Sequence, residues 1–217
     1  MNKKNLVRVI VAVGLVCVLA IGLISAYFTD VETASNVFTI GKIDVELQEP
    51  NWVEPNSVLP EQELAKDPQV KNVGTNDAYV FLEVEVPYAN IVTANDDGTK
   101  NATTDTELFT YTVNDDWVSV GEKVKNENTK TVTYLYAYGT DTEMTALVKD
   151  ATTATLFDYI KFVNVVDGQS LETTIQNVTV KAYAIQTSNI NDGKTALDGN
   201  NADGKVTPAE VWAVVSK

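Results

Sequence analysis

The sequence predicts an all-β protein, an antiparallel β-sandwich or jelly roll followed by a short C-terminal helix. Apolar and polar residues alternate in several short runs between residues 41 and 190, which is the pattern of half-buried strands. These runs are rich in β-branched and aromatic residues, and clusters of Asn, Asp and Gly separate them. No repeat of fixed period is visible, so residues 41–190 are predicted to form one sandwich domain.

The first two clear strands show the alternation best. In "KIDVELQEP", Ile43, Val45 and Leu47 alternate with charged or polar neighbours. In "DAYVFLEVEVPY", Glu83 and Glu85 share one face of the predicted strand. The apolar residues of the opposite face are Val80, Leu82, Val84 and Val86. A Pro-rich acidic segment, "EPNWVEPNSVLPEQELAKDP", connects the two runs and is predicted to be a loop.

Later runs continue the pattern with turns between them. "LFTYTVNDDWVSVG" is predicted to form two short strands around an Asn-Asp-Asp turn, and "KTVTYLYAYG" and "LETTIQNVTVKAYAIQT" to form one strand each. "TLFDYIKFVNVVDG" is compatible with either a strand or a helix. Tyr134, Tyr136 and Tyr138 share one strand face, where they either cover the core edge or bind a glycan.

The tail, residues 191–217, passes from an Asp/Asn/Gly-rich loop into a short helix. Thr207, Pro208 and Glu210 form a capping pattern, with Thr207 as N-cap, Pro208 in the first turn and Glu210 reaching back. The same segment also has the spacing of a calcium loop if Gly204 takes the sixth position. The candidate ligands are then Asp198, Asn201, Asp203 and Glu210, although Gly199 occupies the first position.

The composition excludes several function classes. The chain has no histidine, which excludes a Ser-His-Asp triad and an H-E-x-x-H zinc motif. Its only cysteine, Cys17, lies in the predicted signal, so the mature domain can have no disulfide. Its net charge of −14 disfavours binding to nucleic acid. The paired acids elsewhere lie in turn-like contexts without a common cleft. We therefore expect a protein that is not an enzyme and carries no cofactor, except for the possible calcium ion.

Residues 1–26 are predicted to be a secretory signal peptide. Lys3, Lys4 and Arg8 precede an uncharged stretch that ends in Ile-Ser-Ala, which favours cleavage between Ala26 and Tyr27. The alternative is an uncleaved anchor, because the uncharged stretch is just long enough to span a bilayer. We expect a secreted protein, in the extracellular matrix or at the cell surface, that contacts a membrane only through an uncleaved signal.

The region after the signal resembles a known family. "YFTDVETASNVFTIGKIDVEL" is similar to the start of TasA/camelysin proteins of Gram-positive bacteria, which have an aromatic-Phe-x-Asp, a polar stretch and then "F-x-x-G-x-[IL]-D-[VL]-x-L". "DPQVKNVGTNDAYVFLEVEVP" and "LFDYIKFVN…VKAYAIQT" also resemble the body of clostridial members. The set of motifs is ordered along most of the chain, although none of them is catalytic.

The resemblance implies a jelly-roll subunit of biofilm matrix fibres, processed by the signal peptidase SipW. In this interpretation the subunit associates with copies of itself and with other matrix proteins. The mature N-terminal segment, residues 27–40, would be a donor strand that enters the next subunit's sheet. The residues assigned to donation are Tyr27, Phe28, Val31, Val37 and Phe38. Two alternatives stay open: a camelysin-like cell-surface metalloprotease, and a monomeric adhesin that binds glycans.

Overall fold

The computed structural model describes residues 42–55, 57–169, 171, 176–188 and 205–216. The predicted signal peptide and donor segment therefore lie outside the described residues. The strands and the helix of the described part are β1 (Val45–Gln48), β2 (Glu63–Ala65), β3 (Gln69–Asn72), β4 (Ala78–Ile91), β5 (Thr104–Glu107), β6 (Phe109–Thr110), β7 (Trp117–Ser119), β8 (Val124–Asn126), β9 (Thr131–Thr140), β10 (Glu143–Met144), β11 (Tyr159–Phe162), β12 (Thr179–Gln186) and α2 (Pro208–Val215).

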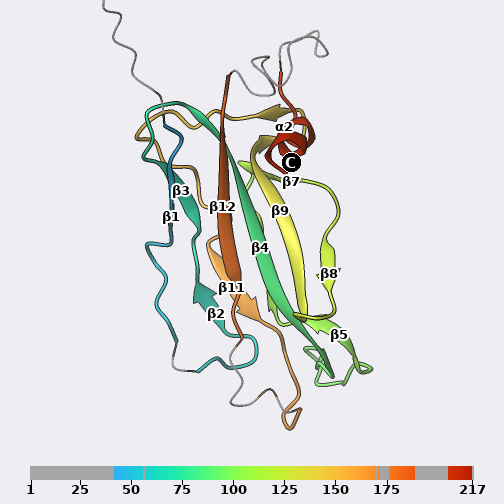
Figure 1. The fold of residues 1–217 in the computed structure, drawn as a ribbon. Coiled ribbons are helices and arrows are strands. Elements are labelled where there is room, and N and C mark those ends of the chain that lie inside the picture. Colours follow the sequence, from blue (N-terminus) through green and yellow to red (C-terminus); the bar gives the residue numbers. More distant parts are fainter. Residues whose placement is uncertain (1–41, 56, 170, 172–175, 189–204, 217) are drawn as a thin grey trace, which may run out of the picture. The chain divides into compact units, whose positions relative to one another are not determined.

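The strands form three antiparallel sheets. The largest has the order β10-β9-β4-β12, with β5 paired to β4 and with β7 and β8 paired to β9 (Figure 1). The other two are β1-β3 and β2-β11-β6. Every strand pair is antiparallel. The all-β antiparallel prediction is confirmed, whereas the finer jelly-roll topology stays a prediction.

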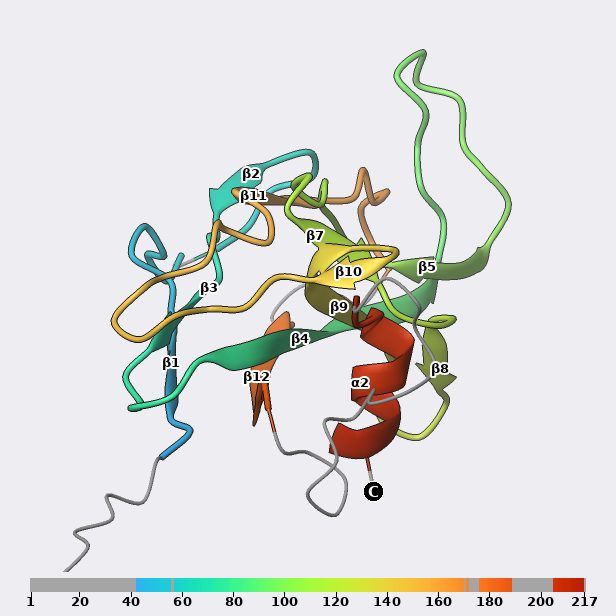
Figure 2. The same cartoon turned by 90° about the horizontal axis from the view of Figure 1, so that it is seen from above.

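The main core lies between the large sheet and the two smaller ones. Figure 2 shows β4 and β12 on one side of this core and β2 and β11 on the other. β4 contributes the four apolar residues that the sequence predicted, and all four are completely buried: Val80, Leu82, Val84 and Val86. Phe109 and Phe162 contribute from the facing sheet, with ring centroids 5.4 Å apart. Burial of these side chains is the main term that stabilises the domain.

A second apolar cluster covers the outer face of the large sheet, under helix α2. Phe81 on β4 is completely buried there, 5.1 Å from the ring of Trp212, and Val211 is also fully buried. The helix begins as predicted, because the Thr207 side chain accepts a hydrogen bond from the Glu210 N–H and the Glu210 side chain caps the Thr207 N–H. The predicted C-terminal helix is therefore confirmed.

The tyrosine stripe on β9 belongs to the core and not to an exposed surface. Tyr136 is buried, and Tyr134 and Tyr138 pack against the same cluster. The Tyr111 and Tyr136 hydroxyls are 3.0 Å apart, and the Tyr134 hydroxyl donates to both oxygens of Glu107 at 2.8 Å. Burial, together with the neighbouring Tyr136, raises the pKa of Tyr111 above its ordinary range. The core interpretation of this stripe is confirmed.

The Pro-rich segment contains structure that the sequence pattern did not predict. It holds β2, and β3 follows it directly. These strands have only three and four residues, so neither offers a full alternating run. β3 pairs with β1, and β2 pairs with β11, which settles the ambiguous run after Thr155 as a strand. Pairing with distant partners, rather than local preference, makes these segments strands.

Candidate assembly edge

Strand β12 forms one edge of the large sheet. It pairs with β4 along its whole length, and the Thr187 N–H continues this pairing by donating to the Asp77 carbonyl at 3.3 Å. In an antiparallel ladder, alternate residues point their backbone groups to opposite sides. The N–H and C=O groups of Val180, Ala182 and Ala184 therefore face away from β4. Within the described part of the chain, no hydrogen bond satisfies them.

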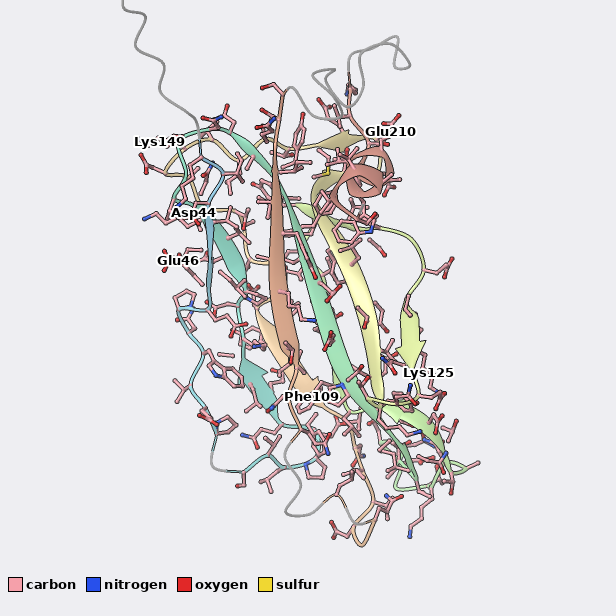
Figure 3. All side chains as sticks on the ribbon, viewed as in Figure 1. Asp44, Glu46, Phe109, Lys125, Lys149 and Glu210 are labelled. Atoms are coloured by element: carbon pink, nitrogen blue, oxygen red, sulfur yellow. The ribbon has the colours of Figure 1, made fainter. Side chains whose placement is uncertain are left out.

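Strand β1 presents a second open edge close by. The Val73 N–H donates to the Asp44 carbonyl at 3.0 Å, which sets the alternation of the β1-β3 ladder. Val45 and Leu47 consequently point their backbone groups away from β3, while their side chains pack against the core. Cα atoms of β1 lie within 8 Å of those of β12, although the two strands are not paired. Figure 3 shows Asp44 and Glu46 along this strand.

The side chains that β12 and β1 direct towards the core are apolar. Val180 and Ala182 are half-buried and pack against the same core cluster as Val45 and Leu47. Neither set carries a charged side chain on the inner face, because Lys181 points outwards to Glu83 and Glu85 at 3.0 and 2.6 Å. An added strand could pair with the free backbone groups and place apolar side chains on the core.

The opposite edge of the large sheet, at β8, is protected by charged side chains. β8 is fully exposed, but Lys125 at its centre forms ion pairs with Asp105 at 2.6 Å and Glu127 at 2.8 Å. Lys130 and the Tyr88 hydroxyl also bind Glu127, at 3.1 and 2.6 Å (Figure 3 labels Lys125 beside β8). Charged side chains on an edge, lysine above all, discourage pairing with another chain. The two sides of the sheet thus differ in their suitability for strand addition.

The charged edge has a testable pH signature at Glu127. Hydrogen bonds from Lys125, then Tyr88, then Lys130 hold its pKa at about 2, below the usual 4.5. Because the folded pKa is the lower one, this group stabilises the fold above pH 4.5 and loses its contribution as the pH falls towards 2.

We expect a carboxyl ¹³C NMR titration to place the pKa of Glu127 near this low value, and Lys125→Met to raise that pKa. Lys149→Met, on another surface, should leave it unchanged; a wild-type Glu127 that titrates near 4.5 would contradict the cluster.

The predicted site residues fall mostly outside the described part of the chain. Ala26 and the donor residues precede residue 42, and the candidate calcium ligands Asp198, Asn201 and Asp203 lie in the segment 189–204. Glu210 is described, and its carboxylate accepts hydrogen bonds from the Thr207 N–H at 3.0 Å and hydroxyl at 2.7 Å. The calcium loop and the cleavage site stay predictions.

Sequence reasoning did not identify the residues that could accept a donor strand. Val180, Ala182, Val45 and Leu47 look in the sequence like residues of any half-buried strand. Their edge position depends on which distant strands pair, and the alternating pattern carries no sign of it. The only local hint is the pair of small residues, Ala182 and Ala184, which leaves the inner side of β12 without bulky side chains.

The fold defines an all-β protein whose large sheet has one open edge, at β12, and one charged edge, at β8. The family model described as camelysin metallo-endopeptidase matches residues 1–120, which is more than half of the chain. The chain therefore belongs to the camelysin family, which is also the TasA family. No curated protein and no solved structure matches the chain.

The family description raises the question of a catalytic metal. Zinc peptidases hold their metal mainly through histidine, with carboxylate or cysteine ligands beside it. This chain has no histidine, and the part that the structure describes contains no group of three acidic or cysteine side chains arranged to hold a metal ion. The residues present do not fit a zinc centre, so we derive no catalytic step through one. Among the described residues, no helix is both long and apolar enough to cross a membrane.

Proposed function

We propose that the chain is a secreted structural subunit of extracellular matrix or cell-surface fibres. Its mature N-terminal segment, residues 27–38, would pair with the open edge of β12 in the next copy, beside β1. The observation that carries this proposal is the row of backbone groups at Val180, Ala182 and Ala184 that have no partner among the residues that the structure describes, next to the β1 edge. Such groups are readily satisfied by an added strand.

The sequence of the donor segment suits this role. In an extended strand, alternate residues face the same side, so Val31 and Val37 would both face the acceptor's core. Phe28 and Phe38 would lie on the other face and cover the outer surface of the new strand. The contact joins one copy's N-terminal segment to a different surface of the next copy. Because this head-to-tail contact is not self-complementary, it propagates as a filament and does not stop at a dimer.

Removal of the signal peptide would then act as the assembly switch. While residues 1–26 remain attached, the donor segment is held at the membrane and another subunit cannot reach it. Cleavage after Ala26, which we assign to SipW, would free Tyr27 and the residues that follow. Since residues 1–26 carry three positive charges and no acid, their loss also makes the chain more negative, which favours solubility before assembly.

A truncation tests the proposal directly. A chain that begins at Tyr27 should form filaments visible by electron microscopy, and a chain that begins at Gly41 should remain monomeric. A matched pair of charge substitutions sharpens the test within the donor: Val37→Asp should block assembly, whereas Asn36→Asp, on the opposite strand face, should not. Filaments from the Gly41 chain, or equal assembly by the two aspartate variants, would rule out strand donation.

The family description supports a second candidate function, a metallo-endopeptidase. Such an activity would need a metal held by carboxylates alone, and these are unusual ligand sets for peptide hydrolysis. An assay of the chain from Tyr27 on a denatured protein substrate, with added zinc or calcium and with chelator, distinguishes the two. Metal-dependent cleavage that is lost on chelation would support the peptidase.

A further inference from the structure

A cleft lies where β2 and β11 pair. Figure 2 shows these two strands on the side of the core opposite β4 and β12. Its volume is about 550 Å³, within the range of small-molecule sites. The lining residues are Asn51, Ala65, Asp67, Thr155, Asp158 and Tyr159. Tyr159 and Ala65 are direct cross-strand partners, so the pairing of β11 with β2 holds these two lining residues side by side.

Tyr159 supplies an exposed aromatic surface to this cleft. Its side chain is 58% exposed, whereas the other large aromatic residues of the described part are buried or half-buried. The backbone of Tyr159 is held on β11 by its pairing with Ala65, and the Tyr159 hydroxyl has no hydrogen-bond partner within the described residues. An aromatic ring with a free polar tip can pack on an apolar ligand face and form a hydrogen bond at the same time.

The polar groups of the cleft are held in place by hydrogen bonds and keep free acceptor positions. Asp67 is 4% exposed, and its two oxygens accept from the Asn51 N–H at 3.0 Å and the Asn51 side-chain amide at 2.7 Å. Asp158 Oδ1 accepts from the Thr155 hydroxyl at 2.7 Å, and the Asp158 carbonyl accepts from the Lys66 N–H at 3.1 Å. Asp158 Oδ2 and Asn51 Oδ1 have no partner within the described part of the chain.

The charges of the cleft indicate which ligands it can accept. The nearest buried cation, Lys66, points to both oxygens of Glu49 at 2.7 and 2.9 Å and lies 4.6 Å from the Trp52 ring, so its charge is already compensated. Asp67 and Asp158 therefore leave the cleft negative. An anionic ligand would be repelled. A calcium ion would need six to eight oxygen ligands, more than two carboxylates and their neighbours are arranged to give.

We propose that this cleft binds a neutral carbohydrate. A hexose ring has one apolar C–H face for the Tyr159 ring and hydroxyl groups that donate to fixed acceptors. Those acceptors are Asp158 Oδ2 and Asn51 Oδ1, and the Tyr159 hydroxyl can donate or accept. The open cleft suits an internal unit of a polysaccharide chain. This inference goes beyond filament assembly, since the cleft and the assembly edge lie on different strands.

Binding can be measured by isothermal titration and by amide chemical shifts on the chain from Tyr27, with Val37→Asp added where assembly would broaden the signals. The probes are cellohexaose, laminarihexaose and maltohexaose, with an acidic oligogalacturonate and calcium chloride alone for comparison. We expect at least one neutral oligosaccharide to bind and to shift the amides of Tyr159 and its neighbours. The oligogalacturonate should bind more weakly than the best neutral probe.

Substitutions separate a specific site from general surface contact. Tyr159→Ala should weaken binding by about tenfold, because it removes the ring, and Tyr159→Phe should retain most of it. Asp158→Asn should weaken binding, whereas Asp141→Asn, a matched substitution in an exposed turn outside the cleft, should not. Filaments should form normally in all four variants, which separates this proposal from the fibre proposal.

Several results would overturn the carbohydrate proposal. One is the absence of binding by all three neutral probes, and another is unchanged affinity in Tyr159→Ala. A preference for the oligogalacturonate would show that the charge argument is wrong. Shifts at Asp67 and Asp158 with calcium alone, without any response to sugars, would identify the cleft as a cation site instead.

Discussion

Ala182→Pro should abolish filament formation by the chain that begins at Tyr27, while the domain stays folded. The Ala182 N–H points away from β4, so proline removes no hydrogen bond of the existing sheet. It does remove a donor from the free edge, and its ring occupies the space that an incoming strand needs. We expect no filaments even at about ten times the concentration at which the wild-type chain assembles, because one strand hydrogen bond and close approach are both lost.

The matched control for this substitution is Ser119→Pro. The N–H of Ser119 points away from β9 on β7, so this variant places the same ring at a free N–H on the other side of the large sheet. Circular dichroism should show that both variants are folded, and electron microscopy should show filaments only for Ser119→Pro. Assembly by Ala182→Pro, or its loss in both variants to the same extent, would place the acceptor elsewhere.

The sequence predicted the parts of the fold that depend on local patterns. Val80, Leu82, Val84 and Val86 fill the core, and Glu83 faces outwards, because the alternation of β4 covers a long run. Thr207 and Glu210 cap the helix as their spacing indicates. The short strands β2 and β8 could not be predicted in this way, because three residues contain less than two periods of alternation. They become strands through their pairing with β11 and β9.

Of the candidate assembly site, the sequence could predict the donor half but not the acceptor half. The proposed donor segment follows the predicted signal peptide and carries a family-like motif, so the sequence alone suggests this half of the site. The proposed acceptor edge exists because β1 and β12 are neighbours that do not pair with each other. These two strands are more than a hundred residues apart in the sequence. The carbohydrate cleft likewise joins Asn51, Asp67 and Tyr159 from segments that sequence reasoning assigned to a loop and to an undecided element. Sites made by long-range pairing require the structure.

Asn72→Ala should cost about 2–4 kcal/mol of the free energy of unfolding, a large effect for one polar side chain. Asn72 is completely buried at the end of β3. Its side-chain amide donates to the Asn76 and Leu147 carbonyls at 2.9 and 2.8 Å, and its oxygen accepts from the Gly74 N–H at 2.9 Å. Alanine would leave the Gly74 N–H and the Asn76 carbonyl without this partner, whereas the Leu147 carbonyl would keep the Ala78 N–H at 3.1 Å. Removing one partner from a buried polar group is the costly way to lose a hydrogen bond.

Urea unfolding of the chain from Gly41 would measure this loss without interference from assembly. Asn90→Ala is the matched control, because the Asn90 side chain binds Asp105 at an exposed position and should change stability by less than about 0.5 kcal/mol. A loss at Asn72 no larger than this control would show that the turn is not held by its amide. The same turn also holds Lys42, because the Thr75 hydroxyl accepts from the Lys42 N–H at 2.7 Å and the Thr75 N–H donates to the Lys42 carbonyl at 2.9 Å.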